Sequence, residues 1–375
     1  MSQTFDVIVL GLGAAGSSAL YHLSKTGKKV CGIDQFSPPH TFGSSHGQSR
    51  IIRQAYHENP KYVPLVKQAY DYWAELEKES GRQLFKQTGG IMLGHRDAGV
   101  VKGAELSAQT HNIPYEYLDS HTINQRYPAF KPGEATVGIL EKTAGILFPE
   151  DCIEANLNLA AKNQAEIRLN EKVISINPHE HSVEIVTAKG RYTTDKLVVS
   201  AGAWLTELLP EPHLPLTVER QVLYWFKNSD SSPSRPVLNE LPVYIWEYTP
   251  GKIFYGFPDL GDGIKVAHHH AGEPTTPHTL TKQVREDEVQ AMSEVIGRYF
   301  NINPVFNYAT TCMYTNTPDE NFIIDHHPNY KHIIVASPCS GHGFKFASVT
   351  GKILSDMALD KKPEADISMF SIHRF

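Results

Sequence analysis

Four residues near the start of the chain have the types and spacing of a nucleotide-binding turn. Gly11, Gly13 and Gly16 follow an apolar run that predicts a strand, and Asp34 ends the next apolar run. Glycines at these positions allow a tight turn and let a pyrophosphate approach the free N–H groups of the following helix. A carboxylate at Asp34 can accept hydrogen bonds from a ribose diol. The pattern predicts bound NAD or FAD, and an acid with no arginine nearby argues against NADP.

Three stretches farther along carry longer patterns: SSHGQSRIIR at 44–53, CMYTNTPDENFIID at 312–325 and SGHGFKF at 340–346. Together with YGFP at 255–258 and the closing FSIHRF, they resemble the monomeric sarcosine oxidase and N-methyltryptophan oxidase family of flavoproteins. The resemblance extends over essentially the whole chain. It implies that the nucleotide is FAD and that the chemistry is the oxidation of an amine.

The resemblance also implies a covalent bond between the protein and the 8α-methyl group of FAD. In the family this bond is a thioether to the cysteine that begins the CMYT stretch, which is Cys312 here. Cys339 is the alternative, because it precedes the glycine-rich turn that would face the flavin. Most free cysteines are small buried hydrophobic residues, and we assign Cys31 and Cys152 to packing.

Two cations match the family's carboxylate-binding pair, Arg53 and Lys345. A guanidinium can hold both oxygens of a carboxylate, and an ammonium adds a point charge. Arginine and lysine are usually solvated at the surface. Both of these lie in apolar runs, so we expect them to be at least partly buried and paired. Ile245 lies where the family contacts the far side of the substrate.

Three more basic residues match positions around the flavin ring. Lys265 corresponds to the lysine beside flavin N5, where a fixed cation would lower the cost of forming superoxide from oxygen. Without the resemblance, a lysine on an exposed strand edge would be the default interpretation. Arg50 matches an arginine stacked over the flavin, and His46 matches a histidine that lines the same face.

Three consecutive histidines follow Lys265 in the same predicted strand. The second of them, His269, aligns with a substrate-contacting histidine of the family. Side chains alternate along a strand, so His269 should share a face with Lys265 while His268 and His270 point away. Because of this alternation the three rings cannot meet at one metal ion, and we expect no metal site.

Aromatic and glycine residues complete the expected site. Tyr255 and Tyr314 match positions that shape the family's substrate pocket, although either could be a packed core tyrosine. The start of the last helix would supply backbone N–H groups that stabilise negative charge on the flavin. This cofactor-binding turn would consist of Gly341, His342, Gly343 and Phe344.

The chain departs from the family just before Arg50. The family has an aspartate and a threonine where this chain has Gln48 and Ser49. An amide in place of a carboxylate alters the charge balance near the first arginine. We expect this change to affect substrate preference more than activity.

Composition excludes several broad classes of protein. The chain has 375 residues, of which 41% are hydrophobic and 20% charged, and its net charge is −6. The 35 basic residues are scattered, so we expect neither nucleic acid nor a membrane surface as a partner. Apolar runs are far shorter than the ~20 residues that span a bilayer. The four cysteines lack CxxC spacing, which suits a reducing cytoplasm, and the resemblance favours a monomer.

The predicted elements place these residues in two domains of an α/β fold. Strand–turn–helix patterns at the start, middle and end of the chain predict a Rossmann-type FAD-binding domain assembled from residues 1–85, 146–215 and 316–375. Alternating β-branched and aromatic residues from about 215 to 270 predict antiparallel sheet. We assign residues 86–145 and 216–315 to this substrate domain.

Individual elements follow from hydrophobic periodicity. We expect helices over 14–26, 60–80, 150–163 and 281–300, and strands over 5–10, 29–33, 172–176, 183–187 and 191–194. Two further strand–turn–helix units are expected over 196–209 and 332–359.

The resemblance implies an oxidase that demethylates an N-methyl amino acid such as sarcosine or N-methyl-L-tryptophan. The products would be the amino acid, formaldehyde and hydrogen peroxide. Other secondary amines and Amadori amino acids are alternative substrates. An NAD-dependent dehydrogenase and a non-catalytic flavin-binding subunit are the alternative functions, and a colourless protein or a lack of peroxide release would favour them.

Overall fold

The glycine turn lies at the centre of a parallel sheet. A computed structural model of the chain describes residues 3–230, 232 and 236–375. β1 (Gln3–Leu10) pairs in parallel with β2 (Val30–Ile33) on one side and with β12 (Arg191–Val199) on the other. Apolar residues of β1 are buried on both of its faces, as expected for a central strand of a covered parallel sheet.

This first sheet has eight strands in the order β10-β11-β12-β1-β2-β9, with β20 beside β12 and β19 beside β20. Its remaining strands are β9 (Glu166–Arg168), β10 (Val173–Pro178), β11 (Val183–Thr187), β19 (Ile323–His326) and β20 (Ile333–Ser337). β20 is parallel to β12, whereas β10 and β11 form an antiparallel extension.

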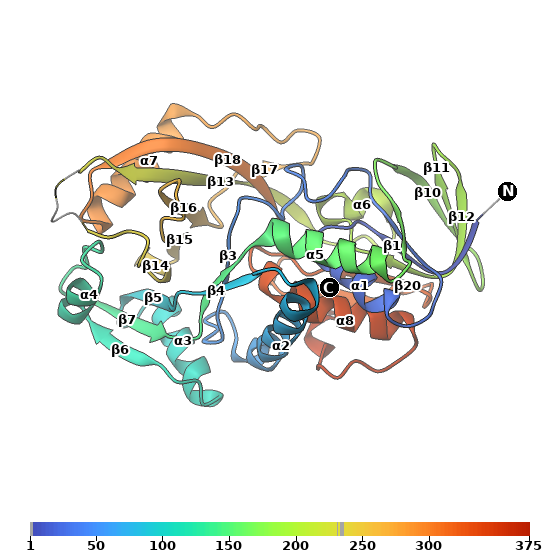
Figure 1. The fold of residues 1–375 in the computed structure, drawn as a ribbon, viewed down its shortest axis with the longest axis horizontal. Coiled ribbons are helices and arrows are strands. Elements are labelled where there is room, and N and C mark those ends of the chain that lie inside the picture. Colours follow the sequence, from blue (N-terminus) through green and yellow to red (C-terminus); the bar gives the residue numbers. More distant parts are fainter. Residues whose placement is uncertain (1–2, 231, 233–235) are drawn as a thin grey trace.

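Four helices cover one face of the first sheet (Figure 1). α1 (Ala14–Ser24) contacts α5 (Pro149–Lys162) and α8 (Ala347–Ala358), and α2 (Val63–Ser80) contacts α5 and α8. Val7 and Val9 of β1 point into this helical layer, while Ile8 and Leu10 point to the opposite core. The alternation is the one that a strand buried on both faces requires.

The second sheet has nine strands and forms the other half of the molecule (Figure 1). Its order is β17-β13-β16-β15-β14-β5-β7-β6, with β18 paired to β13. The strands are β5 (Gly90–His95), β6 (Glu116–Asp119), β7 (Thr136–Glu141), β13 (Thr217–Asn228), β14 (Val243–Thr249), β15 (Lys252–Phe257), β16 (Ile264–His269), β17 (Pro274–Thr275) and β18 (Pro304–Asn316). The predicted antiparallel pairing is confirmed from β13 to β16, and β14 is parallel to β5.

Helices and a small sheet complete the fold. α7 (Glu286–Tyr299) packs Met292 and Ile296 against the apolar core on the outer face of the second sheet. The small sheet has the order β3-β8-β4. The other elements are β3 (Arg50–Ile52), β4 (Phe85–Gln87), β8 (Gly145–Leu147), α3 (Gly99–Thr110), α4 (Ser120–Arg126), α6 (Leu205–Leu208), η1 (Pro60–Tyr62), η2 (Gly202–Trp204), η3 (Phe344–Phe346), η4 (Ser368–Phe370) and η5 (Ile372–Arg374).

The α/β fold class is confirmed, with two corrections at the level of elements. The strands predicted over 191–194 and at the start of 196–209 are one strand, β12. The helix predicted to follow it is confirmed as η2 and α6 and ends at Leu208, one residue early, because Leu209 precedes Pro210 and takes φ −126° and ψ 84°. A residue before proline is sterically pushed out of the helical region. The domain boundaries stay a prediction.

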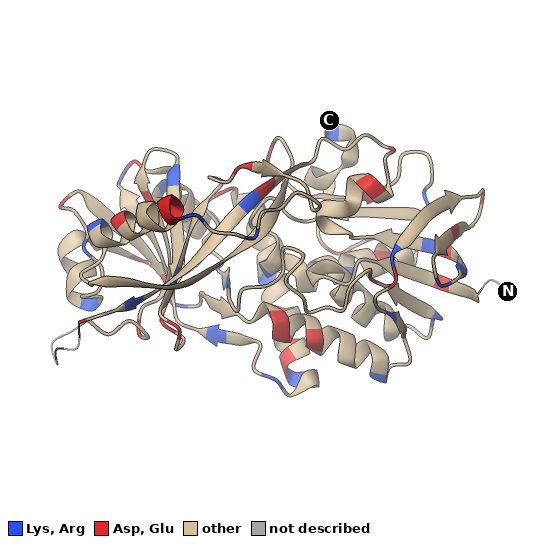
Figure 2. Ribbon diagram, turned by 90° about the horizontal axis from the view of Figure 1, so that it is seen from above, with Lys and Arg blue, Asp and Glu red and all other residues tan. Residues whose placement is uncertain are grey.

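Charged residues are interspersed along both halves of the ribbon, as Figure 2 shows. On α7 the acids Glu286, Asp287 and Glu288 lie in the first turn, and the basic Arg298 lies in the last turn. Among the described residues, no helix combines the length and the apolar character needed to cross a bilayer.

Candidate active site

The glycine turn leaves the start of α1 open toward a pocket. Gly11 has a φ of 83°, which favours glycine, and a Cβ on Gly16 would lie 1.7 Å from the Gly11 carbonyl oxygen. Gly16 therefore lets the helix pack on the turn. Gly13 precedes α1 without a side-chain cap, and a Cβ there would meet nothing closer than Ser45 Oγ at 3.9 Å. The pocket has room where the helix N–H groups can bind an anion.

Asp34 holds this turn from the neighbouring strand. Its Oδ2 accepts the Leu12 amide at 2.7 Å, and its Oδ1 accepts the Phe36 amide at 2.8 Å. The side chain lines the pocket, and burial raises its pKa. Each carboxylate oxygen has a second lone pair, so Asp34 can hold the turn and also accept a hydrogen bond from a ligand.

One continuous pocket runs from the glycine turn to the second sheet. Most of the residues predicted from the sequence lie in its lining. These are Gly11, Gly13, Asp34, Arg50, Arg53, Ile245, Tyr255, His269, Cys312, Tyr314, Gly341, His342, Gly343, Phe344 and Lys345. Gly16, His46 and Lys265 lie outside this lining and contact residues that form it or adjoin it.

One face of the second sheet forms a wall of the pocket. Ile245 of β14 pairs with Tyr255 of β15, and His269 lies at the end of the adjacent β16. Cys312 and Tyr314 come from β18. The hydroxyl oxygens of Tyr255 and Tyr314 lie 3.3 Å apart. Alternation along the strands directs these five side chains toward the pocket and leaves the opposite face to pack under α7.

Lys265 is buried on the same face of β16 as His269, with its Nζ over the Phe257 ring, rather than exposed on a strand edge. Its Nζ donates to the carbonyl oxygens of Gly47 and Ser49 at 2.7 and 2.9 Å and to Ser49 Oγ at 3.1 Å. These acceptors match the three donors of an ammonium group. Burial and the nearby Arg50 charge lower the pKa of Lys265 well below its usual value. Ser49, one of the two departures from the family pattern, is thus a direct partner of Lys265.

Arg50 and His46 belong to the same loop. Arg50 donates to the carbonyl oxygens of Ser44, His46 and Ser49 at 2.6–2.7 Å, which orders the loop around the guanidinium. Burial, Arg50 and Lys265 lower the pKa of His46 to about 4. His46 is therefore neutral at physiological pH, and its Nε2 has no hydrogen-bond partner among the described residues.

Arg53 is buried and paired, as its apolar surroundings predict. It contacts Glu58 at 2.6 and 2.9 Å and His57 Nδ1 at 2.8 Å, and it donates to the Ala55 carbonyl oxygen at 2.9 Å. Burial would raise the pKa of Glu58, but Arg53 outweighs it and holds that pKa well below its usual value. The sequence analysis missed Glu58, although a buried arginine requires a carboxylate partner and Glu58 is the next acid in the chain.

Lys345 lies in η3, directly after the glycine-rich turn. Its Nζ donates to the His342 carbonyl oxygen at 2.7 Å and lies 5.3 Å from the centroid of the Tyr56 ring. Burial and the Arg53 charge lower the pKa of Lys345 to about 7. His342 contacts the Tyr56 hydroxyl through Nδ1 and the Glu320 carbonyl oxygen through Nε2 at 2.9 Å. The two predicted substrate-binding cations are therefore close enough to influence one another.

Two of the four cysteines border the pocket, Cys312 and Cys339. Burial raises the pKa of the Cys312 thiol, while Arg50 and Lys265 act in the opposite direction by favouring the thiolate. Burial raises the pKa of Cys339 to about 11, and no cation opposes it there. The other two, Cys31 and Cys152, are buried in the apolar cores.

The histidine run does not follow the predicted alternation to its end. His268 packs against Tyr248 on the far side of the sheet, and His269 lines the pocket, as predicted. His270 lies beyond β16 with a φ of 50°, so its ring packs against His269 instead of pointing away. Across the described chain, no three His, Cys, Asp or Glu side chains gather in a way that could hold a metal ion.

Comparison with known proteins places this geometry in a family. The model of the FAD dependent oxidoreductase family matches residues 6–357. The chain belongs to this family. It is 42% identical to monomeric sarcosine oxidase of Streptomyces avermitilis, over all of this chain and 98% of that protein. It is 36% identical to N-methyl-L-tryptophan oxidase of Yersinia pestis, over 99% of both chains.

Solved structures show the same fold. NikD, described as an unusual amino acid oxidase essential for nikkomycin biosynthesis, superposes with a TM-score of 0.86 at 21% identity. The superposition covers 99% of this chain and 98% of NikD. The family match favours FAD over the alternative of NAD.

The residues of the pocket fit FAD. The space beside Gly13 and the uncapped start of α1 suit a pyrophosphate, and Asp34 offers a carboxylate oxygen for a ribose. The pocket then extends without interruption to Cys312 and Tyr255. When bound, FAD accepts two electrons from a substrate and passes them to an acceptor.

Proposed function

We propose that the chain is a monomeric, cytoplasmic oxidase that removes the N-methyl group of a small amino acid of the sarcosine or N-methyl-L-tryptophan type. One substrate, one oxygen and one water would give the demethylated amino acid, formaldehyde and hydrogen peroxide. The names of its full-length relatives support this substrate class.

The observation that carries the proposal is a pair of buried cations with unused donors on the pocket wall. Arg53 Nε is buried without a hydrogen-bond partner among the described residues, although the rest of the guanidinium is paired. Lys345 Nζ donates to His342 alone, which leaves donors free on the ammonium. A buried donor without a partner costs free energy, and a substrate carboxylate would satisfy both groups.

The wall formed by the second sheet suits the amine of the substrate and its hydrocarbon substituent. Ile245 presents a hydrocarbon surface, and the Tyr255 and Tyr314 hydroxyls can donate or accept a hydrogen bond. Burial and His270 lower the pKa of His269 well below its usual value, so His269 is neutral and can accept a hydrogen bond from the proton of a protonated amine. The amine must lose this proton before its lone pair can assist oxidation, and we expect kcat to rise from pH 6 to 9.

We further propose that Cys312 carries FAD through a thioether. Cys312 lines the pocket within the influence of Arg50 and Lys265, whose charges favour the thiolate. Cys339 also borders the pocket but lacks such cations. We assign Lys265 the task of stabilising negative charge on oxygen, and Arg50 and His46 the shaping of the adjacent loop.

Product analysis tests this function. Purified protein is incubated in air with sarcosine, N-methyl-L-tryptophan, other secondary amines and an Amadori amino acid, and peroxide and formaldehyde are assayed. We expect equal amounts of both products from an N-methyl amino acid. Peroxide without formaldehyde from another amine would show that the substrate is not an N-methyl amino acid. A lack of peroxide from every amine would support a non-catalytic flavin-binding subunit.

A further inference from the structure

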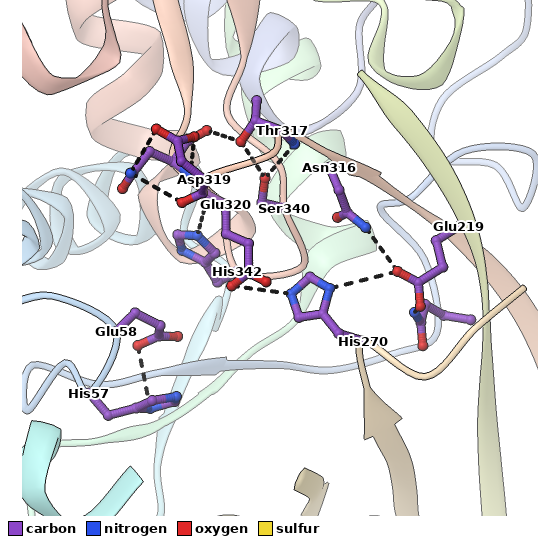
Figure 3. A network of polar contacts seen from close by, with 12 residues as sticks. His57, Glu58, Glu219, His270, Asn316, Thr317, Asp319, Glu320, Ser340 and His342 are labelled. Atoms are coloured by element: carbon purple, nitrogen blue, oxygen red, sulfur yellow. Dashed lines mark hydrogen bonds and ion pairs between the residues drawn. The ribbon is translucent and has the colours of Figure 1, made fainter. Parts of the chain in front are cut away.

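His270 lies in a polar network behind the pocket wall (Figure 3). Its ring centroid is 4.2 Å from that of His269 and 5.5 Å from that of Tyr314, and both of these residues line the pocket. His270 itself does not belong to the pocket lining. Its contacts with the pocket run through these two neighbours.

Two carboxylates lie on opposite sides of the His270 ring, as Figure 3 shows. Nδ1 lies 3.7 Å from Glu219 Oε2, and Nε2 lies 4.0 Å from Glu320 Oε2. Both distances are typical of ion pairs rather than of hydrogen bonds. Such pairs form only when the imidazole carries a second proton, because the neutral ring has no net charge.

Glu219 is a fixed anchor for this contact. Its Oε1 accepts the Gly272 amide and Gln221 Nε2, and its Oε2 accepts Asn316 Nδ2 at 2.9 Å. The side chain is largely buried on β13. Three donors therefore hold the carboxylate in place beside His270.

Glu320 connects His270 to the glycine-rich turn. The carbonyl oxygen of Glu320 accepts a hydrogen bond from His342 Nε2 at 2.9 Å, and His342 lines the pocket. The same segment is tied to this turn by the Thr317 amide, which donates to Ser340 Oγ at 3.3 Å. A contact made by the Glu320 carboxylate is thus coupled to the backbone that borders the ligand.

The His269 ring is enclosed between His270 and this turn. A Cβ on Gly341 would lie 3.0 Å from His269 Cε1 and 2.5 Å from Tyr314 Cε2. The ring therefore has little freedom on the side of Gly341. His270 fills the neighbouring side, so the orientation of His269 depends on where His270 is held.

We infer that His270 is a positioning residue, which, held between Glu219 and Glu320, fixes the His269 ring and strengthens the binding of carboxylate-bearing ligands. The inference rests on the proposed function for the presence of a carboxylate on the substrate. It concerns the affinity of the pocket and not the oxidation step itself.

Charged and titratable groups surround the His270 ring. Glu219 faces it from β13, Glu320 from the turn after β18, His269 from β16 and Tyr314 from β18. The two carboxylates therefore hold the ring from two sides, against the aromatic residues of the pocket wall.

Acetate is the probe, because its binding to the holoenzyme can be followed through the flavin absorbance without turnover. His270→Gln should weaken acetate binding about fivefold, the upper range for a partly exposed ion pair. With substrate, KM should rise while kcat changes less than about twofold. Glu320→Gln, on an exposed side chain, should reproduce part of the effect.

His268→Gln is the matched control, since His268 lies on the same strand but packs on the opposite face. It should leave acetate affinity unchanged. Equal affinities for His270→Gln and the wild type, or equal losses in the two variants, would overturn the inference. Acetate binding that depends on His270 in a protein that oxidises no N-methyl amino acid would retain the inference and refute the proposed function.

Discussion

Buried lysines in this molecule differ in how fully their ammonium groups are satisfied. Lys265 has three oxygen acceptors within 3.1 Å, whereas Lys345 donates to one carbonyl oxygen. Arg53 is paired with Glu58 but keeps a buried donor without a partner among the described residues. Unsatisfied donors on Arg53 and Lys345 favour an anionic ligand, while the satisfied Lys265 acts as a fixed part of the wall.

Lys345→Met should weaken carboxylate binding and flatten its pH dependence. The pKa of about 7 means that Lys345 is charged below pH 7 and neutral above it, so affinity should fall as pH rises through 7. Losing a charge-assisted hydrogen bond costs about 1.5–3 kcal/mol, or roughly 10- to 150-fold in the Kd of acetate. Lys352→Met, which alters an ion pair on the outer side of α8, is the control. Unchanged acetate affinity in Lys345→Met would refute the carboxylate site.

Lys265→Met should slow the reaction with oxygen far more than it changes substrate binding. A fixed cation stabilises the negative charge that oxygen acquires, and removing one such group typically costs about 100-fold or more. Stopped-flow measurement of flavin reoxidation reports this step directly. A normal reoxidation rate in this variant would show that Lys265 does not stabilise the negative charge on oxygen.

Cys312→Ser should release FAD into the supernatant when the protein is precipitated with acid. Serine has nearly the same size but cannot form the thioether, so the pellet should be colourless. Cys339→Ser is the matched control, because Cys339 borders the same pocket. A yellow pellet from Cys312→Ser and a colourless one from Cys339→Ser would show that Cys339 forms the thioether instead.

At the scale of elements, two glycines of the turn, Gly13 and Gly16, meet different requirements. One leaves space for a ligand, and the other allows the helix to pack. Gly16 is needed for packing, since a Cβ there would lie 1.7 Å from the Gly11 carbonyl oxygen and 2.5 Å from Ser200 Oγ. Gly13 faces open space in the pocket and has a φ of −68°, which any residue can adopt. Packing of α1 therefore requires glycine at position 16, whereas at position 13 the space is left for a ligand.

Gly16→Ala and Gly13→Ala test this separation. Overpacking at Gly16 should lower the free energy of unfolding by about 1–3 kcal/mol, measured by urea denaturation of the protein. Gly13→Ala should leave the stability of the flavin-free protein unchanged and reduce its FAD content. Similar stability losses in both variants would contradict the different roles of the two glycines.

Elements defined by local signals could be predicted from the sequence, and those shaped by distant contacts could not. β1, α1, α2 and α5 follow from hydrophobic period and glycine or proline positions within each segment. β5, α3, β6, α4 and β7, between residues 86 and 145, were not predicted individually. Their strands pair with one another and join the rest of the second sheet only where β5 pairs with the distant β14. The helical segment after β12 was predicted correctly, and its end at Leu208 fits the local signal of Pro210.

At the scale of the whole molecule, the pocket joins residues that are far apart in the chain. It extends from the first sheet near Gly13 to the wall of the second sheet at Tyr255, and the turn at Gly341 borders it as well. The residue types of the site could be predicted because long family patterns carried them. Ser49 could not be predicted as a partner of Lys265, since this contact depends on how a distant loop folds over the second sheet, whereas Glu58 lies close after Arg53 in the chain and could have been inferred.

Anaerobic mixing with sarcosine or N-methyl-L-tryptophan tests the central claim most directly, because it isolates electron transfer from an N-methyl amino acid to the bound flavin. We predict that the yellow flavin absorbance bleaches on mixing with at least one of them and returns when air is admitted, with one peroxide released per flavin. Absorbance that stays unchanged with both substrates, in protein that contains FAD, would contradict the account.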